Sequence, residues 1–267
     1  MTSWRDFERA GWESHVDPYH QFFGPICARL ADHLLDAVRV GSGTRLLDAC
    51  CGPGYLAGRA LERGAVVDGV DIAQAMVELA VALYPAARFQ VGDCEELRYG
   101  DDTFDGVVCN LGLHHLTSPE RGVAEFARVL RAAGRLSLTV WDENRSALAI
   151  VPEAIAEAGA IAPNDLPTPP NAPAYDSADH LEPLLQTAGL GLESVEPVTF
   201  VQTYPSRQAL WEGWLAAAIR TGPLFAAQTH QVQETARQRF GDLAAPYLEV
   251  DGTVALPVGF LVVTATR

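Results

Sequence analysis

The strongest local signal in the chain is LLDACCGPGY, residues 46–55. A short apolar run ends in Asp48, a turn with two glycines follows, and a helical pattern begins at Tyr55. A strand that enters a glycine turn and then a helix brings backbone N–H groups and the positive end of the helix dipole toward a ligand. A glycine turn alone is weak evidence, because dinucleotide dehydrogenases contain one too. The neighbouring patterns have to decide what this turn binds.

Strand and helix patterns alternate around this turn as far as Trp141. Apolar runs typical of buried strands stand at 66–71, 87–92, 104–110 and 135–141. Helical patterns stand between them at 55–63, 73–84 and 119–131. This alternation predicts a parallel, doubly wound α/β sheet.

The regular alternation of strand and helix patterns ends after Asp142. Five prolines within 162–174 predict a loop. Helices are predicted at 144–159, with an interruption, and at 179–189, 207–221 and 227–240, and strands at 192–201 and 254–266. We expect these last two strands to join the sheet edge as an antiparallel pair.

Three acids follow successive strands. Asp48 stands at the mouth of the glycine turn, Asp71 ends the next strand 19 positions after Gly52, and Asp93 follows the third strand. Carboxyl ends of neighbouring parallel strands meet at one edge of a sheet, so we expect the three carboxylates to converge. They would repel a pyrophosphate near Asp48 but accept a nucleoside that carries a sulfonium and an ammonium. The structural alternative is that Asp48 and Asp71 are helix N-caps.

Composition excludes several classes of protein. The chain has 267 residues, 48% of them hydrophobic, which can fill a core. Its net charge of −15 disfavours a nucleic-acid partner. The N-terminus lacks a signal-peptide pattern, and no apolar run reaches the roughly 18 residues of a membrane span. The five cysteines form no CxxC pair, so we expect no disulfide framework, no metal and a reduced, cytoplasmic location.

Four ordered motifs carry a resemblance to a known family: DACCGPG at 48–54, GVDI at 69–72, GDCE at 92–95 and LHHL at 113–116. Together they resemble class I S-adenosylmethionine-dependent methyltransferases, most closely the ubiquinone/menaquinone-type small-molecule branch. The resemblance covers residues 40–145. It implies a Rossmann-like, seven-stranded, mostly parallel sheet with an antiparallel edge strand, and S-adenosylmethionine as methyl donor.

The resemblance also implies a role for individual residues. The 48–54 loop would hold the methionine part of the cofactor, and Asp71 would bind the ribose hydroxyls. Asp93 would meet the adenine amino group, with the Cys94 N–H at the ring nitrogen. The residues expected to bind the cofactor are Tyr19, Asp48, Ala49, Cys50, Gly52, Gly54, Asp71, Ile72, Met76, Asp93, Cys94, Asn110 and Leu111.

One position departs from the family pattern. Cys50 stands where the family loop has its first glycine. A Cβ disfavours positive φ, so we expect either ordinary dihedral angles at Cys50 or a slightly displaced loop. We interpret the Cys50-Cys51 pair as buried packing.

Two histidines are the predicted catalytic residues, together with one acid. His114 and His115 follow the fourth strand, and Asp142 follows the fifth. A histidine base is useful when the methyl acceptor is a hydroxyl or an acidic carbon, and a carboxylate can fix its tautomer. We expect one imidazole to face the site and the other to pack or to cap the helix at Pro119. A structural role for both is the alternative.

The predicted organisation has four segments. They are an N-terminal helical cover at 1–40, the cofactor core at 41–143, a lid at 144–178, and completion of the sheet at 179–267 with a helical acceptor-side insertion at about 203–250. Aromatic residues concentrate outside the core, as helix packing or as a cover over a flat, apolar acceptor. They are Trp4, Phe7, Trp12, Tyr19, Phe22, Phe23, Trp141, Trp211, Trp214, Phe225 and Tyr247.

The favoured function is therefore an enzyme that methylates a small aromatic or polyketide-like metabolite. O-methylation is preferred because a histidine base is at hand, and C- and N-methylation stay open. The alternative is a cofactor-binding protein of the same fold that has lost methyl transfer and serves binding or a non-methylating rearrangement. An NAD(P)-linked oxidoreductase is disfavoured, since all 19 basic residues are arginine and no Tyr-x-x-x-Lys pair exists. Neither nucleic acid nor membrane is an expected partner; the substrate and oligomeric state are left open.

Overall fold

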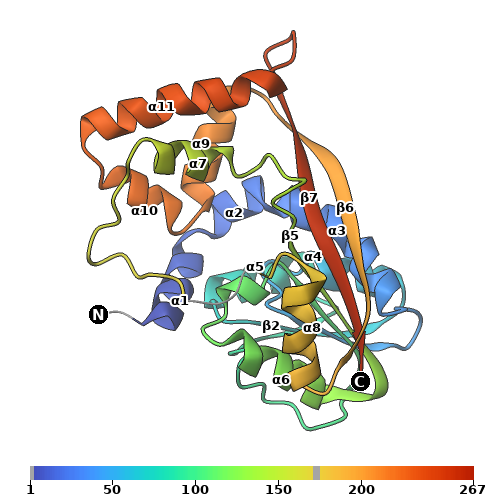
Figure 1. Ribbon diagram of the computed structural model, residues 1–267. Coiled ribbons are helices and arrows are strands. Elements are labelled where there is room, and N and C mark those ends of the chain that lie inside the picture. Colours follow the sequence, from blue (N-terminus) through green and yellow to red (C-terminus); the bar gives the residue numbers. More distant parts are fainter. Residues whose placement is uncertain (1–2, 171–174) are drawn as a thin grey trace. The chain divides into compact units, whose positions relative to one another are not determined.

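The computed structural model describes residues 3–170 and 175–267. Within these residues seven strands form one sheet in the order β3-β2-β1-β4-β5-β7-β6 (Figure 1). The predicted seven-stranded Rossmann-like sheet is thereby confirmed. The strands are β1 (Arg45–Ala49), β2 (Val66–Asp71), β3 (Arg88–Val91), β4 (Phe104–Asn110), β5 (Leu130–Trp141), β6 (Gly191–Tyr204) and β7 (Val254–Thr266).

Strand direction follows the prediction. The ladders from β3 to β5 are parallel. β7 runs against β5, because Ala133 donates its N–H to the Arg267 carbonyl while Asp142 donates to that of Gly259. The strand order reverses between β1 and β4, and in parallel sheets ligands bind at the carboxyl edge of such a switch point.

The chain divides into two compact units, which we describe separately. The first, called the sheet unit, consists of the described residues within 24–141, 169–198 and 261–267. Besides its strands it contains α3 (Gly24–Ala37), α4 (Tyr55–Glu62), α5 (Gln74–Leu83), η1 (Leu113–His115), α6 (Pro119–Val129) and α8 (Ala178–Thr187).

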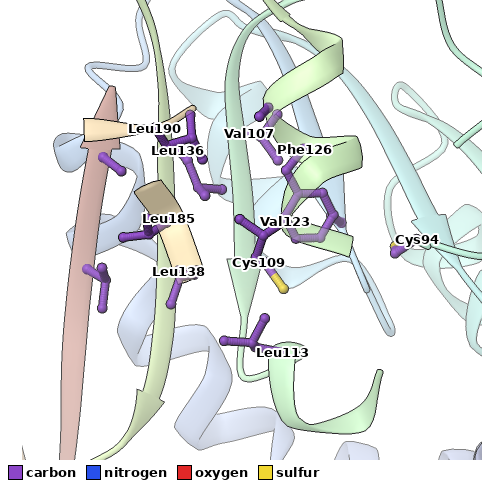
Figure 2. Packing of buried hydrophobic residues seen from close by; sticks show 14 of the residues in the cluster. Cys94, Val107, Cys109, Leu113, Val123, Phe126, Leu136, Leu138, Leu185 and Leu190 are labelled. Atoms are coloured by element: carbon purple, nitrogen blue, oxygen red, sulfur yellow. The ribbon is translucent and has the colours of Figure 1, made fainter. Parts of the chain in front are cut away.

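One core cluster of the sheet unit lies between α6, α8 and the central strands. Figure 2 shows Val123 and Phe126 of α6 beside Val107 and Cys109 of β4, with Leu185 of α8 near β5. These five side chains have no exposed surface. Burial of a side chain the size of Phe126 contributes roughly 1.5–3 kcal/mol, so this core holds the carboxyl ends of the strands in a fixed frame.

The second unit, called the helical unit, consists of the described residues within 1–23, 142–168 and 199–260. In this unit α11 packs along α7, and α2 packs along α9. Each of the predicted segments 1–40, 144–178 and 179–267 contributes to both units, and their roles as cover, lid and acceptor side remain predictions. The helices are α1 (Trp4–Ser14), α2 (Val16–Phe22), α7 (Ile150–Glu157), α9 (Arg207–Ala217), α10 (Thr221–Ala226) and α11 (His230–Ala244), followed by η2 (Ala245–Tyr247).

The helical unit corrects one prediction. Residues 207–240 contain three helices rather than two, because α9 ends at Ala217 and Ala218 adopts an extended conformation. α10 then begins at Thr221, which places Pro223 in a first turn where its missing N–H costs no helical bond. The described part of the proline-rich stretch, 162–170, contains no helix or strand, as predicted, and 171–174 lie outside the described residues. Among the helices described, none is long and apolar enough to span a membrane.

Candidate functional site

Two buried acids hold the glycine turn at the carboxyl edge of the sheet. Asp71 accepts hydrogen bonds from the Gly52 N–H at 2.8 Å and from the Ala73 N–H at 3.0 Å. Asp48 accepts one from the Ala57 N–H, in the first turn of α4, at 3.1 Å. The N-cap alternative is thus partly correct, because both acids bind N–H groups at helix starts, although neither occupies the N-cap position.

These two carboxylates lie in an environment that lacks an arginine partner among the described residues. Asp48 is 2% exposed and Asp71 8%. Burial raises the pKa of Asp48 well above its usual range, and the charge of Asp71 raises it further. Burial also raises the pKa of Asp71, against the lowering effect of its backbone hydrogen bonds and of His115. No arginine of the described chain pairs with either acid. A cationic ligand would supply the missing charge.

The backbone of the turn excludes ordinary dihedral angles, the first of the two alternatives for Cys50. Its φ is +55°, so it adopts the left-handed conformation that the family's glycine would adopt. Such a conformation costs roughly 1–2 kcal/mol in a residue with a Cβ. The Cys50 N–H donates to Cys94 Sγ at 3.3 Å, and Gly112 lies so close that an added Cβ would stand 2.5 Å from the Cys50 Cβ. The surrounding contacts therefore hold a cysteine where a glycine is expected.

The cysteines around the turn are free thiols. Hydrogen bonding to the Cys109 and Cys94 thiols, together with burial, raises the pKa of Cys50 well above its usual range. Burial raises the pKa of Cys51, which the charges of Asp71 and Asp48 increase further. Because the thiolate is the reactive form, this environment supports the packing interpretation. No group of three or more His, Cys, Asp or Glu in the described ranges is arranged to hold a metal.

The other predicted cofactor contacts of the sheet unit lie along the same edge. Gly54 has a φ of +79°, and an added Cβ would stand 2.8 Å from Phe89 Cζ, so only glycine fits there. Ala49 is fully buried at the end of β1, and Met76 is buried in α5. Ile72, which follows β2, is half-buried.

The end of β3 contains a residue that the sequence did not single out for a role. Asp93 is half-buried and accepts the Glu95 N–H at 2.8 Å. The buried Glu95 accepts the N–H groups of Thr117 at 2.6 Å and Ser118 at 3.1 Å, at the start of α6. Glu95 thus joins the predicted adenine edge to the segment after the histidines. The sequence predicts that a histidine packs or caps there. It does not predict the role of Glu95, because no local pattern relates positions 22 residues apart.

Thr139 of β5 is a second residue that the sequence did not reveal. Its hydroxyl donates to Asn110 Oδ1 at 2.7 Å and accepts the Leu111 N–H at 2.9 Å. The Asn110 amide also donates to the Cys27 carbonyl at 3.1 Å, and Leu111 has a φ of +57°. The side chain of Asn110 therefore shapes the chain after β4, which leaves the backbone of Asn110 and Leu111 as the part that can approach a ligand.

The two histidines form the short helix η1 directly after this turn. Their ring centroids are 4.1 Å apart. His114 is exposed as a residue, although protein atoms lie densely around its ring. Desolvation by that surrounding protein lowers the pKa of His114 well below its usual range, and the neighbouring His115 lowers it further. The neutral, base-competent form is therefore favoured at His114.

Two predicted site residues belong to the helical unit. Asp142 is 3% exposed, and its Oδ2 lies 2.5 Å from Nη1 of Arg145. Its predicted partnership with a histidine stays a prediction. Tyr19 of α2 packs with Trp12 at 5.3 Å and Phe23 at 5.8 Å between ring centroids, and its contact with the cofactor likewise stays a prediction.

Comparison with known proteins relates the carboxyl edge of the sheet to a family. Residues 47–138, which include the glycine turn, Asp71, Asp93 and both histidines, match the family model described as a methyltransferase domain. Residues 47–138 are therefore similar to a methyltransferase domain. The resemblance drawn from the four motifs is thereby confirmed.

The methyltransferase domain has curated relatives in bacteria. The chain is 38% identical over 117 residues to 27-O-demethylrifamycin SV methyltransferase of Amycolatopsis mediterranei, covering 41% of this chain and 43% of the relative. It is 28% identical over 149 residues to the ubiquinone/menaquinone biosynthesis C-methyltransferase UbiE of Geobacter sulfurreducens, covering 51% and 58%. The chain thus spans about half the length of the curated relatives it matches.

Solved structures extend the similarity beyond the domain. A TehB-like SAM-dependent methyltransferase from Corynebacterium glutamicum has a TM-score of 0.52 at 20% identity, covering 95% of this chain and 98% of its own. At this identity the likeness shows the fold alone. The family match supports the predicted cofactor, S-adenosylmethionine.

The residues of the methyltransferase domain fit this cofactor. S-adenosylmethionine carries an ammonium and a sulfonium, and Asp48 and Asp71 are carboxylates whose pKa values are raised by burial, so a cationic ligand would favour their charged forms. The glycine turn adds backbone groups at a helix start, where Gly52 and Gly54 leave no side chain in the way. Asp71 lies at the carboxyl end of β2, where acids bind ribose hydroxyls in nucleotide-binding sheets.

Proposed function

We propose that this protein transfers a methyl group from S-adenosylmethionine to a small metabolite. The observation that carries the proposal is the pair of buried carboxylates, Asp48 and Asp71, which no arginine of the described chain pairs with, at the glycine turn of the stretch that matches a methyltransferase domain. The cofactor supplies the methyl group already attached to a good leaving group. The protein then has to bind the two molecules, align them and manage one proton.

The chain divides these tasks among its residues. Asp48 attracts the positively charged part of the cofactor, and Asp71 binds the ribose hydroxyls through the lone pairs that the Gly52 and Ala73 N–H groups do not use. Asp93 and the Cys94 N–H bind the adenine. Thr139 fixes the backbone after β4 through its two hydrogen bonds, and so positions η1 and its histidines.

We further propose that the acceptor is a hydroxyl and that His114 removes its proton. The lowered pKa of His114 keeps a ring nitrogen free to accept that proton while the acceptor oxygen takes the methyl group. The identity of 38% to an enzyme named as a 27-O-demethylrifamycin SV methyltransferase supports an acceptor from secondary metabolism. Asp142 would orient or stabilise the imidazolium that forms.

Methyl-labelled cofactor tests the proposal. The protein is incubated with labelled S-adenosylmethionine and a panel of phenols, polyketides and macrolides, and products are read by mass spectrometry. We expect a labelled oxygen–methyl product, with calorimetry showing that the cofactor and its demethylated form both bind. Binding without transfer to any acceptor would favour the alternative, a binding protein. Absence of cofactor binding would overturn both.

A further inference from the structure

The helical unit contains a continuous cluster of aromatic side chains. Phe22 stacks on Tyr204 at 5.2 Å between centroids and meets the edge of Trp214 at 6.1 Å, and Phe23 meets Trp214 at 5.4 Å. Through Tyr19 the series continues to Trp12. We call these residues the aromatic cluster: Trp12, Tyr19, Phe22, Phe23, Tyr204 and Trp214.

The cluster is built into the packing of α2 on α9. Gly213 of α9 lies so close to Phe22 that an added Cβ would stand 2.5 Å from its ring. This close approach brings Phe22 between Tyr204, at the end of β6, and Trp214, on α9. Figure 1 shows α2 and α9 side by side, so three segments far apart in the sequence form one aromatic surface.

Two polar atoms in this cluster lack a protein partner. The Tyr204 hydroxyl and the Trp214 Nε1 are both buried, and neither has a hydrogen bond in the part of the chain that the structure describes. Tyr204 as a whole is 6% exposed. Trp12 provides the contrast, because its Nε1 donates to Glu8 at 2.7 Å. Burial of an unpaired donor is costly, so such groups call for an explanation.

We propose that Tyr204 and Trp214 donate hydrogen bonds to an oxygen of a flat, apolar ligand bound at the aromatic cluster. The indole N–H can only donate and the hydroxyl can donate beside it, so together they favour an oxygen acceptor such as a carbonyl or ether over an ammonium. Burial raises the pKa of the Tyr204 phenol, so the hydroxyl keeps its proton at any physiological pH. The rings supply the apolar and stacking surface.

A matched pair of probes tests the proposal without any methyl transfer. 2-Hydroxy-9-fluorenone and 2-hydroxyfluorene share a flat tricyclic frame and differ at the carbonyl. We expect the protein to bind the fluorenone at least about 5-fold more tightly, measured by calorimetry in the presence of S-adenosylhomocysteine. Tyr204→Phe and Trp214→Phe should each reduce this preference about 3- to 10-fold and leave binding of hydroxyfluorene nearly unchanged.

Matched variants control for packing. Trp211 lies on α9, like Trp214, and packs on Phe225 and Phe240. The Trp211→Phe variant should keep the preference for the fluorenone. Tyr204→Phe should not lower the melting temperature, since the hydroxyl has no protein partner to lose. Equal affinity of the two probes for the wild-type protein, including no binding of either up to its solubility, would overturn the proposal. A preference for the fluorenone that persists in both Tyr204→Phe and Trp214→Phe would also overturn the proposal.

Failure of this test is distinct from failure of the proposed function. Calorimetry with S-adenosylmethionine reports on Asp48 and Asp71 of the sheet unit, whereas the fluorenone pair reports on the helical unit. If the protein binds the cofactor but shows no preference for the fluorenone, the proposed methyl transfer stands. The proposed roles of Tyr204 and Trp214 are then wrong.

Discussion

Two groups of carboxylates flank helix α4, and their surroundings are opposite. At its start, Asp48 and Asp71 are buried and receive only backbone N–H groups. Further along, Asp32 is half exposed and binds Arg59 at 2.9 Å and Arg63. Hydrogen bonds from these two arginines lower the pKa of Asp32 to about 2, whereas burial raises that of Asp48.

The difference separates structural acids from binding acids. The charge of an exposed acid with two guanidinium partners is already compensated in the folded chain, and the ion pairs stabilise the fold modestly. A buried acid without a cation costs stability until a ligand completes it. The histidines show the same contrast. His180 pairs with Asp176 on the surface, whereas the pKa of His114 is lowered by desolvation.

The largest expected effect concerns the histidines. His114→Ala should lower turnover about 10²- to 10⁴-fold on the true acceptor with cofactor affinity nearly unchanged, because a general base contributes that much. The wild-type rate should fall as pH drops through the lowered pKa of His114, since only the neutral imidazole accepts a proton. Steady-state kinetics over pH measures both. His180→Ala is the control, and wild-type turnover in both His114→Ala and His115→Ala would remove the base from the proposal.

The second effect concerns cofactor affinity. Asp71→Ala should weaken S-adenosylmethionine and its demethylated product about 10- to 150-fold, because a hydrogen bond to a charged group contributes roughly 1.5–3 kcal/mol. Isothermal calorimetry measures the change. Asp32→Ala, which removes an acid of the paired group, should leave the affinity unaltered. If both substitutions weaken binding equally, the contrast between the two groups does not hold.

The third effect is a pH dependence at Asp48. Its folded-state pKa is raised, so its contribution to stability is present at low pH and is lost as pH rises through that pKa. The cofactor-free Asp48→Asn protein should therefore be more stable than wild type at pH 8, by on the order of 1–3 kcal/mol, with the gap closing toward pH 4. Cofactor affinity should show the opposite trend and rise with pH in wild type only. Denaturant unfolding of both proteins at several pH values measures the difference in stability. If that difference does not change with pH, the raised pKa of Asp48 is not its source.

The smallest effect is the mirror image at Asp32. Its folded-state pKa is depressed to about 2, so its stabilisation is present above the unfolded-state pKa and is lost as pH falls toward 2. Asp32→Asn should cost no more than about 1 kcal/mol at pH 7, because solvent screens exposed pairs. Thermal melts at pH 7 and pH 2.5 measure it. A cost that stays the same at both pH values would show that the ion pairs are not its source.

The sequence alone determined the sheet unit and most of the predicted cofactor edge. Strand and helix periods are local properties, and a glycine turn after a buried strand constrains its own geometry, so Asp48, Gly52, Gly54 and Asp71 could be placed from spacing. Parallel pairing then forces the ends of β1 and β2 together, which is why Asp48 and Asp71, two of the three predicted acids, lie close to each other.

Tertiary structure decided what depends on contacts between distant segments. The positive φ of Cys50 is tolerated because Cys94 and Gly112, which lie 44 and 62 residues later, surround it. Thr139 holds the chain after β4 through hydrogen bonds across 28 and 29 residues. Likewise, the packing of α2, β6 and α9 buries the hydroxyl of Tyr204 away from any hydrogen-bond partner among the described residues. No local pattern encodes such pairings, because burial and hydrogen bonding are set by whatever the fold brings alongside.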